Sequence, residues 1–352
     1  MIIRKILVTA HSACLFLGYC FSSSSSTVRR PLEHPWKATH CISLPFLVLI
    51  EIVNSTILAF LQHSLILRRF FVLILLSHLL SACSSGGLFL INSAARLGAD
   101  QIRHEGLAYG EEPWQSLDVY QPKDKCGDRP VMLFFYGGGW NSGAKEDYLF
   151  VADSFTSLGY VVVVPDYATY PTGKFPTFIE DGARAFAWTK NNIPAYSGDA
   201  TRIVLVGHSA GAHLAALLLA DDSYLRAEGL SPADASGFAG LAGPYNFTPT
   251  EPKYQKIFAP PSNYPKMKVS NYITGKEPPM LLVRGTADKT VAAYNQDRLV
   301  ASLEQFGVPY RDRRYAGVTH VGLLLDMAPF FKNGAPLIND MHQFFKQHLE
   351  QK

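Results

Sequence analysis

The sequence predicts an α/β fold with a mostly parallel central sheet and helices on both faces, and three observations support that class. From Gln101 onward, short apolar runs alternate with helical patterns, as in consecutive βαβ units. Hydrophobic residues make up 48% of the 352 residues and charged residues 17%, so the chain can bury a large core. A short glycine-containing turn joins the clearest strand to the clearest helix. We therefore expect one α/β domain over residues 101–352.

Seven segments have the composition of strands. Residues 117–120 read as an early antiparallel strand. The later runs are mostly apolar, which is typical of strands buried on both faces of a parallel sheet. These later strands are expected at residues 131–135, 160–164, 202–206, 238–241, 280–283 and 311–315.

Helices are expected at four places between and after these strands. Apolar residues recur at helical spacing in residues 178–191, and residues 210–220 are an unbroken run of helix-forming residues. The remaining two are residues 294–306 and 337–349. Residues 248–279, rich in proline, tyrosine and lysine, read as an insertion over the carboxyl edge of the sheet, where ligands bind in such folds. A plain surface excursion is the alternative.

Charge divides the chain near residue 83. The whole chain carries a net charge of +3, but residues 1–82 hold seven basic and two acidic residues, which leaves a net charge of −2 for residues 83–352. A balance this small, without a basic cluster in the expected domain, argues against a nucleic-acid partner. We therefore treat residues 1–82 separately from the rest.

The end of that first part has the pattern of a secretory signal. Two arginines precede an apolar run of about eleven residues (70–80), which is shorter than a membrane-spanning helix. Small residues and Cys83 follow, and this segment resembles the lipobox of bacterial lipoproteins. The resemblance implies a signal peptide at 67–82, a lipid on Cys83, a linker at 83–100 and a place in the bacterial cell envelope, on the periplasmic side of the outer membrane.

Such a signal belongs at the start of a protein. No methionine lies between Met1 and Met132, so we hypothesise that translation starts at a non-Met codon near Leu65 or Leu67 and that residues 1–66 are upstream sequence. The alternative is inner-membrane anchoring by N-terminal helices. Residues 42–61 are long enough to span a bilayer, although Glu51 and Asn54 interrupt them.

The five cysteines predict neither a disulfide framework nor a metal site. Three of them lie in the first part, Cys83 would carry lipid, and Cys126 then has no partner. No Cys/His cluster has zinc-ligand spacing. We expect no metal and no cofactor.

A candidate nucleophile follows the strand at 202–206. Gly207-His208-Ser209-Ala210-Gly211 has the Gly-x-Ser-x-Gly pattern of a nucleophile elbow, and the helix at 210–220 begins there as the elbow requires. The serine sits on a sharp turn, and a Cβ on either glycine would strike a neighbouring segment. Ser209 is thereby exposed at a helix N-terminus, where the helix dipole favours developing negative charge.

A glycine run follows the strand at 131–135, where Tyr136-Gly137-Gly138-Gly139-Trp140 begins. Consecutive glycines let backbone N–H groups turn toward one point without a side chain in the way. Gly138 and Gly139, with Ala210, are the predicted donors to the oxyanion. A tight turn without catalytic role is the alternative.

A serine nucleophile needs a base and an orienting acid, in the chain order Ser, Asp or Glu, His. Asp288 follows a predicted strand and His320 lies in the loop after the last one. We expect His320 to take the proton from Ser209 and Asp288 to fix the imidazole tautomer.

Other titratable residues fit these roles less well. Asp312 falls within a strand and Asp326 follows the histidine. His208 and His213 adjoin the serine but cannot fold back onto it, so packing or a pocket wall is their expected role. Structural roles are expected for three acids that precede the nucleophile: Asp166, Asp181 and Asp199.

From about residue 101 to its end, the chain resembles α/β-hydrolases of the esterase group that includes carboxylesterases, hormone-sensitive-lipase-like enzymes and kynurenine formamidase-like enzymes. The matching segments are residues 117–122, 136–140, 207–211, 285–288 and 319–320. Many members have His where Tyr136 stands, which leaves the donors intact but puts in doubt how the loop is held.

This constellation predicts a serine hydrolase that cleaves carboxylic esters through an acyl-enzyme intermediate. An arylformamide is the alternative substrate, and a non-catalytic envelope binding protein on the same fold is the alternative class. Four aromatic residues could line the substrate pocket or pack in the core: Trp140, Tyr170, Phe175 and Tyr245. The short proline-rich insertion predicts a shallow pocket for acyl groups of roughly two to six carbons.

Overall fold

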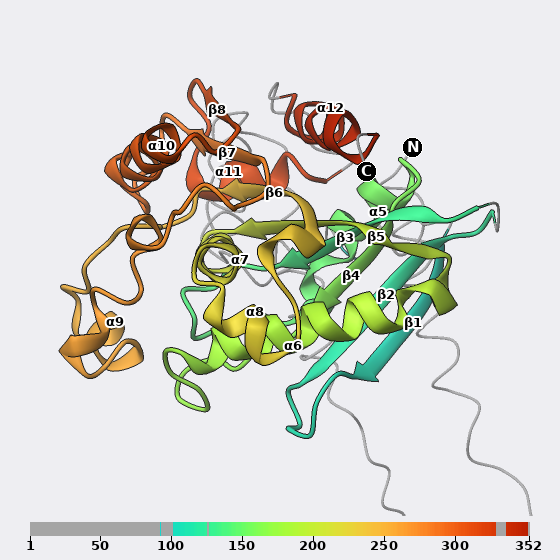
Figure 1. Cartoon of the computed structure of the whole chain (residues 1–352), viewed down its shortest axis with the longest axis horizontal. Helices are drawn as coiled ribbons and strands as arrows, with labels where there is room; N and C mark the ends of the chain where they lie inside the picture. Colours follow the sequence, from blue (N-terminus) through green and yellow to red (C-terminus); the bar gives the residue numbers. More distant parts are fainter. Residues whose placement is uncertain (1–91, 93–100, 125–126, 329–335, 351–352) are drawn as a thin grey trace, which may run out of the picture. The chain divides into compact units, whose positions relative to one another are not determined.

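The computed structural model describes residues 92, 101–124, 127–328 and 336–350 (Figure 1). The chain divides into two units, Met1–Leu75 and Leu76–Lys352, and every described residue belongs to the second. The expected upstream region 1–66, the signal at 67–82 and Cys83 lie outside the described residues, as does the linker 83–100 apart from Asn92. Within the part of the chain that the structure describes, every helix is too short or too polar to span a bilayer.

The described residues contain one sheet of eight strands in the order β1-β2-β4-β3-β5-β6-β7-β8. Strand β2 is antiparallel to β1 and β4, and all later neighbours are parallel. This confirms the predicted mostly parallel α/β sheet with an early antiparallel strand. The strands are β1 (Gln101–Ala108), β2 (Ser116–Pro122), β3 (Arg129–Phe135), β4 (Val161–Pro165), β5 (Gly198–His208), β6 (Ala235–Leu241), β7 (Met280–Gly285) and β8 (Tyr310–Tyr315).

The central strands are buried because both of their faces are covered. The side chains of β3, β4, β5 and β6 are inaccessible over almost the whole of their apolar runs, as expected for parallel strands between two helical layers. Strand β1 was not predicted. Arg103, His104 and Glu105 give it a polar sequence, and it forms only because β2 offers it hydrogen-bonding partners at the sheet edge.

Helices lie on both faces of this sheet. Figure 1 shows α6, α7 and α8 on one side of the strands and α5 and α12 on the other. The short helices α5, α8, α9 and α11 were not predicted, whereas the expected bounds of α7, α10 and α12 are correct. The helices are α5 (Leu149–Thr156), α6 (Thr177–Asn192), α7 (Ala210–Ala220), α8 (Ser223–Ala227), α9 (Pro252–Ile257), α10 (Tyr294–Phe306), α11 (His320–Leu325) and α12 (Leu337–Leu349).

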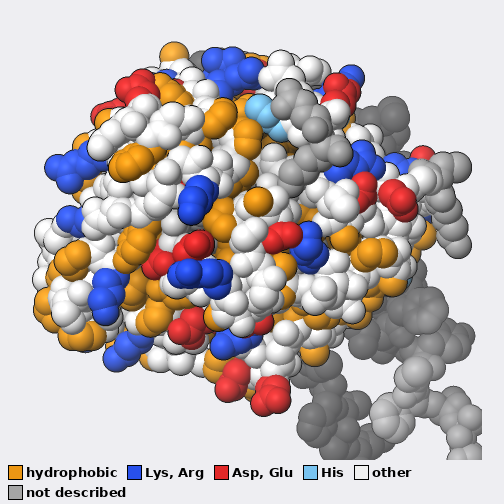
Figure 2. All heavy atoms as spheres, viewed as in Figure 1, with side chains coloured by type: hydrophobic (Ala, Val, Ile, Leu, Met, Phe, Trp, Pro, Cys, Tyr) orange, Lys and Arg blue, Asp and Glu red, His pale blue; other side chains and the backbone are white. Residues whose placement is uncertain are grey.

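The insertion at 248–279 packs onto the domain. It contains α9 and two short 3-10 turns, Pro261–Asn263 and Val269–Asn271. Phe258 packs edge-on against Trp140, which follows the carboxyl end of β3, with 4.9 Å between ring centroids. The insertion therefore lies at the edge of the sheet that the sequence predicts. At the left of the view in Figure 2, where α9 lies, separate Lys and Arg side chains stand among hydrophobic ones.

Candidate active site

The nucleophile candidate sits on a strained strand-to-helix turn. Ser209 directly follows β5 and is the N-terminal capping residue of α7, with φ 52° and ψ −117°. A non-glycine residue rarely adopts a positive φ, and such strain is concentrated at functional sites. The Ser209 N–H donates to the Leu241 carbonyl of β6 at 2.8 Å, and the Ser209 carbonyl accepts from His213 at 3.1 Å. The turn is thus held in place from both sides.

The two flanking glycines are required by close backbone contacts. A methyl group on Gly207 would lie 2.4 Å from the Gly211 carbonyl oxygen. A methyl group on Gly211 would lie 2.1 Å from the carbonyl oxygen of Phe135 at the end of β3. Real Cβ atoms do not approach backbone atoms that closely, so the start of α7 crosses β3 only because position 211 has no side chain.

The structure brings Ser209, His320 and Asp288 together from three different segments. The Ser209 Oγ lies 2.9 Å from His320 Nε2, and His320 Nδ1 lies 2.9 Å from Asp288 Oδ2. Asp288 follows β7 as expected. His320 is the first residue of α11 rather than part of a loop, and the Thr319 hydroxyl caps that helix by accepting from the Gly322 N–H at 3.0 Å. This order of contacts is the one that a serine–histidine–aspartate relay requires.

The carboxylate of Asp288 is held ionised. Burial opposes its charge, but hydrogen bonds from His320 and from the Val291 and Thr290 N–H groups outweigh that effect and hold the pKa of Asp288 below its usual value. With Oδ1 occupied by the two backbone donors, Oδ2 is left to face His320. The arrangement favours a proton on Nδ1, which leaves the Nε2 lone pair directed at Ser209.

His208 lies beneath the site without joining the relay. Its Nε2 is 3.2 Å from the carbonyl oxygen of His320, and the two rings are 4.9 Å apart. Burial, and then the neighbouring His320, lower the pKa of His208 to about 3. The side chain is therefore neutral, and its Nε2–H donates to the His320 backbone. His208 supports the position of the catalytic imidazole, a contact that sequence spacing could not show.

The glycine loop lies beside the nucleophile. A methyl group on Gly137 would be 3.2 Å from the Cβ of Ser209. Gly138 has φ +129° and Gly139 has φ +59°, conformations that favour glycine. Among the described residues, neither of these two N–H groups donates to another protein group. Ala210, in the first turn of α7, has an N–H without an intrahelical acceptor. The three predicted donors are thus available next to Ser209.

Tyr136 holds the start of this loop. Its hydroxyl donates to Asp166 Oδ1 at 2.8 Å, and its carbonyl accepts from the Tyr167 hydroxyl at 2.8 Å. The Tyr136 ring also stacks between Tyr148 and Tyr167, at centroid distances of 5.1 and 4.7 Å. The side chain of Tyr136 therefore holds the loop in place. Many members of the esterase group that the sequence resembles have a histidine at this position. Asp166 has the structural role that the sequence predicts for it.

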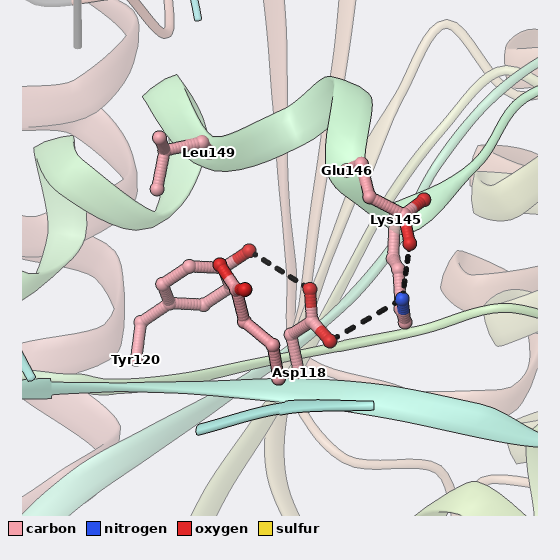
Figure 3. Close-up of a pocket in the computed structure, with 6 residues that line it drawn as sticks. Asp118, Tyr120, Lys145, Glu146 and Leu149 are labelled. Carbon is pink, nitrogen blue, oxygen red and sulfur yellow. Dashed lines mark hydrogen bonds and ion pairs between the residues drawn. The ribbon is translucent and has the colours of Figure 1, made fainter. Parts of the chain in front are cut away.

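A buried ionic cluster lies behind this loop. Lys145, whose backbone N–H also donates to Asp166, places its ammonium 3.3 Å from Asp118 and against Glu146. Figure 3 shows Asp118 between the Tyr120 hydroxyl and the Lys145 ammonium. The cavity that they line has a volume of about 50 Å³, which is room for a water molecule or two rather than an organic substrate. We assign the cluster a structural role.

The four aromatic residues predicted to line the pocket lie in different environments. Tyr245 is completely buried, which supports core packing, and Tyr170 is partly exposed. Phe175 is nearly buried and contacts Phe258 of the insertion. Trp140 is at the centre of an aromatic cluster whose other rings lie within 6.2 Å of it: Phe178, His213, Phe247, Tyr254 and Phe258.

The alternative acids make other contacts. Asp312 accepts from Gln296 at 2.6 Å and pairs with Arg314 at 2.8 Å, so its carboxylate is already engaged away from His320. Asp181 accepts from Gln115 and from the Ala168 N–H. No cluster of three or more His, Cys, Asp or Glu side chains in the described ranges is arranged to hold a metal ion.

The sheet order and the elbow geometry define the class of protein, an α/β-hydrolase. Two family models match parts of the chain: one described as BD-FAE matches residues 117–229, and one described as the prolyl oligopeptidase family matches residues 185–352. Together they cover most of the described domain.

Individual proteins agree with that class. Isoprenylcysteine alpha-carbonyl methylesterase ICME of Arabidopsis thaliana is 28% identical over 247 residues, 64% of this chain and 58% of the relative. Kynurenine formamidase of Danio rerio is 35% identical over 135 residues, 37% of this chain and 45% of the relative. The chain spans between about half and three-fifths of the curated relatives that it matches over the longest stretches.

A solved structure shows the same fold. Esterase B from Lactobacillus rhamnosis has a TM-score of 0.64 with this chain at 18% sequence identity, and the match covers 81% of this chain and 96% of that one. These comparisons confirm the predicted α/β-hydrolase fold and support the predicted carboxylic ester hydrolase.

Proposed function

We propose that this protein is a serine hydrolase that cleaves carboxylic esters through an acyl-enzyme intermediate. The observation that carries the proposal is the continuous relay from Ser209 Oγ to His320 Nε2 and from His320 Nδ1 to Asp288, each step 2.9 Å long. A strained, capped serine beside available N–H donors adds the electrostatic part of the site. The esterase names of the relatives support the same chemistry.

The chemistry follows from these positions. His320 takes the hydroxyl proton as Ser209 Oγ attacks the ester carbonyl, and Asp288 stabilises the imidazolium that forms. The N–H groups of Gly138, Gly139 and Ala210 would receive the negative charge on the carbonyl oxygen. The imidazolium then protonates the leaving alcohol, and an acyl group remains on the serine. Water, deprotonated by the same imidazole, releases the acid and restores the enzyme.

A fluorophosphonate probe tests the nucleophile directly, because it reacts only with an activated serine. We expect the purified chain to be labelled on Ser209 and to release p-nitrophenol from p-nitrophenyl acetate, and we expect Ser209→Ala to abolish both signals. A folded wild-type protein that shows neither signal would contradict the proposal and favour a non-catalytic binding protein on this fold.

An arylformamide is the second candidate substrate, favoured by the match to the kynurenine formamidase of Danio rerio. Both reactions use the same relay, but an amine leaves less readily than an alcohol and depends more on protonation by His320. Comparing kcat/KM for phenyl acetate and formanilide decides between them. We expect the ester to be favoured, and a faster formanilide reaction would reverse the order of the two candidates.

We propose further that the substrates are small and that the protein acts at the bacterial cell envelope. The short insertion at 248–279 supports acyl groups of roughly two to six carbons. The lipobox-like sequence before Cys83 supports attachment through a lipid on that cysteine, at the outer membrane on its periplasmic side.

A further inference from the structure

The insertion places a lysine beside the oxyanion loop. A methyl group on Gly139 would lie 3.5 Å from both the Lys253 Nζ and the Tyr254 Oη, two side chains of α9. Gly137, two residues earlier in the same loop, is in contact range of Ser209. Two residues extend the chain by less than about 8 Å, so the ammonium lies at the entrance to the site and not on a remote surface.

The backbone that carries this lysine is held firmly. Tyr254 packs edge-on against Trp140 and Phe247, with centroids 5.9 and 6.0 Å apart. At the other end of α9, the Ile257 carbonyl accepts from the Phe175 N–H at 3.0 Å. Helix α9 is thereby held against the loop that follows β3, and this places the backbone of the exposed Lys253 close to Gly139.

The charge of Lys253 is not balanced by a protein carboxylate. Among the described residues, no Asp or Glu oxygen lies within 4.0 Å of its ammonium, which sits over the Tyr254 ring at 5.2 Å from the ring centroid. The insertion as a whole has five lysines and two glutamates, in a domain that is otherwise slightly acidic. An anion bound at the entrance would complete the ion pair.

The neighbouring phenol can donate to the same anion. Burial raises the pKa of Tyr254 above its ordinary value, and the nearby Glu251 adds to that effect. The hydroxyl therefore stays protonated at neutral pH. A carboxylate at this place would accept from an ammonium and a phenol together, which are the donors that hydrogen-bond well to a charged oxygen.

We propose that Lys253, with Tyr254, selects esters whose acyl part carries a negatively charged carboxylate a few carbons from the scissile carbonyl. The inference rests on the proposed ester hydrolysis and adds its substrate class. While the scissile carbonyl occupies the donors of Gly138, Gly139 and Ala210, the distal carboxylate meets the ammonium of Lys253. The ion pair between the Lys253 ammonium and the substrate carboxylate would be exposed to solvent. Added salt would therefore screen it and weaken the selection.

The test compares two esters of the same shape and different charge. Ethyl hydrogen glutarate carries a carboxylate, and ethyl glutaramate carries a neutral amide in its place; ethanol release gives kcat/KM for each. We expect the wild-type protein to favour the charged ester at low ionic strength, by up to about fivefold for one exposed ion pair. We expect the preference to shrink in 0.5 M NaCl.

Substitutions assign the preference to one residue. The quantity compared is kcat/KM for the charged ester divided by kcat/KM for the neutral ester. Lys253→Gln should bring this ratio to about one, Lys253→Glu should bring it below one, and Lys253→Arg should keep the wild-type ratio. Lys276→Gln is the matched control, because Lys276 belongs to the same insertion but lines a hollow with Leu219 and Ala220, at the end of α7 opposite Ser209. We expect it to leave the ratio unchanged.

The outcomes separate the two proposals. Hydrolysis of both esters with equal kcat/KM, or a Lys253→Gln variant that keeps the wild-type ratio, overturns the selection and leaves the hydrolase proposal standing. A wild-type protein that hydrolyses neither these esters nor p-nitrophenyl acetate overturns both. A ratio that falls equally in Lys253→Gln and Lys276→Gln would assign the preference to overall charge and overturn the role of Lys253.

Discussion

At the scale of single residues, the site depends on groups whose charge is fixed by their surroundings. Asp288 is ionised because three donors converge on a buried carboxylate. His208 and His213 are neutral because they are buried, and each has one ring nitrogen next to a backbone carbonyl. His320 is thus in direct contact with the Asp288 carboxylate and close to the His208 ring.

The acid of the relay can be tested by Asp288→Asn. The amide cannot stabilise the imidazolium and disturbs the tautomer, so we expect kcat on an aryl ester to fall by several powers of ten with the fold intact. Asp312→Asn is the control, because Asp312 pairs with Arg314 instead, and its activity should stay within a few-fold of wild type. Near-full activity in Asp288→Asn together with loss in Asp312→Asn would transfer the role to Asp312.

Stability should depend on pH through His213. Burial lowers the pKa of this histidine to about 4 in the folded protein, against about 6.5 in the unfolded chain. Below pH 6.5 the unfolded chain therefore binds a proton that the folded protein does not. The stability that the neutral ring contributes is fully present above pH 6.5 and is lost as the pH falls toward 4, by at most about 1.4 kcal/mol per pH unit.

Urea unfolding at pH 6.5 and pH 5.0 measures this effect. We expect the wild-type free energy of unfolding to fall by about 1–2 kcal/mol more than that of His213→Gln, a variant that retains an N–H donor for the Met267 carbonyl. His208 remains in both proteins, so the variant keeps part of the pH dependence. Identical losses in the two proteins would show that His213 already binds its proton at pH 5.0.

At the scale of elements, the crossing of α7 over β3 depends on a missing side chain. Gly211→Ala would force a Cβ to within 2.1 Å of the Phe135 carbonyl oxygen. The Tyr136 carbonyl oxygen would lie 2.3 Å away as well. Because both neighbours are backbone atoms, neither can rotate away, and we expect a loss of unfolding free energy of about 3 kcal/mol or more. Thermal and urea unfolding measure it.

Gly237 provides the matched control for that substitution. It lies in β6, and a methyl group there would have its nearest neighbour at an ordinary 3.6 Å. Gly237→Ala should therefore change the unfolding free energy by less than about 1 kcal/mol. Equal losses for the two variants would show that the crossing tolerates a side chain.

The insertion should limit the length of the acyl chain. Its anchoring on Trp140 through Phe258 and Tyr254 and its prolines favour a fixed rim over a mobile lid. Each extra CH₂ adds about 0.8 kcal/mol only while apolar wall is available. In a series of p-nitrophenyl esters we expect kcat/KM to peak at roughly two to six carbons without activation by emulsified lipid. A maximum at the lauryl ester or beyond would refute the shallow pocket.

At the scale of the whole molecule, the prediction concerns attachment to the membrane. If the segment before Cys83 is a lipoprotein signal, the mature chain begins with a lipidated Cys83, and Ser84 after it favours transfer to the outer membrane. Mass spectrometry of protein from a bacterial envelope should find that modified N-terminus. An unmodified peptide spanning residues 78–90 would exclude lipidation, and peptides from residues 1–60 would exclude the late start of translation.

Much of the fold follows from the sequence, because its signals are local. Strand β5 is indicated by the apolar run before Gly207, and α7 by the unbroken run of helix-forming residues after Ser209. A buried strand and an Ala/Leu-rich helix can be recognised without knowing their distant partners. Strand β1 and helix α11 were missed for the opposite reason. A polar edge strand is selected by the hydrogen bonds of its neighbour, and a six-residue helix by its cap and its packing.

The same division holds at the site. The sequence by itself determined the residue types of the site and their order along the chain. Each of them could be recognised from its local context: Gly-x-Ser-x-Gly, the three glycines, Asp288 and His320. Only the tertiary structure decided the supporting contacts, such as Tyr136 on Asp166, His208 on the His320 backbone and Lys253 beside Gly139. These contacts join residues between 30 and more than 110 positions apart, and packing alone sets which side chains meet over such separations.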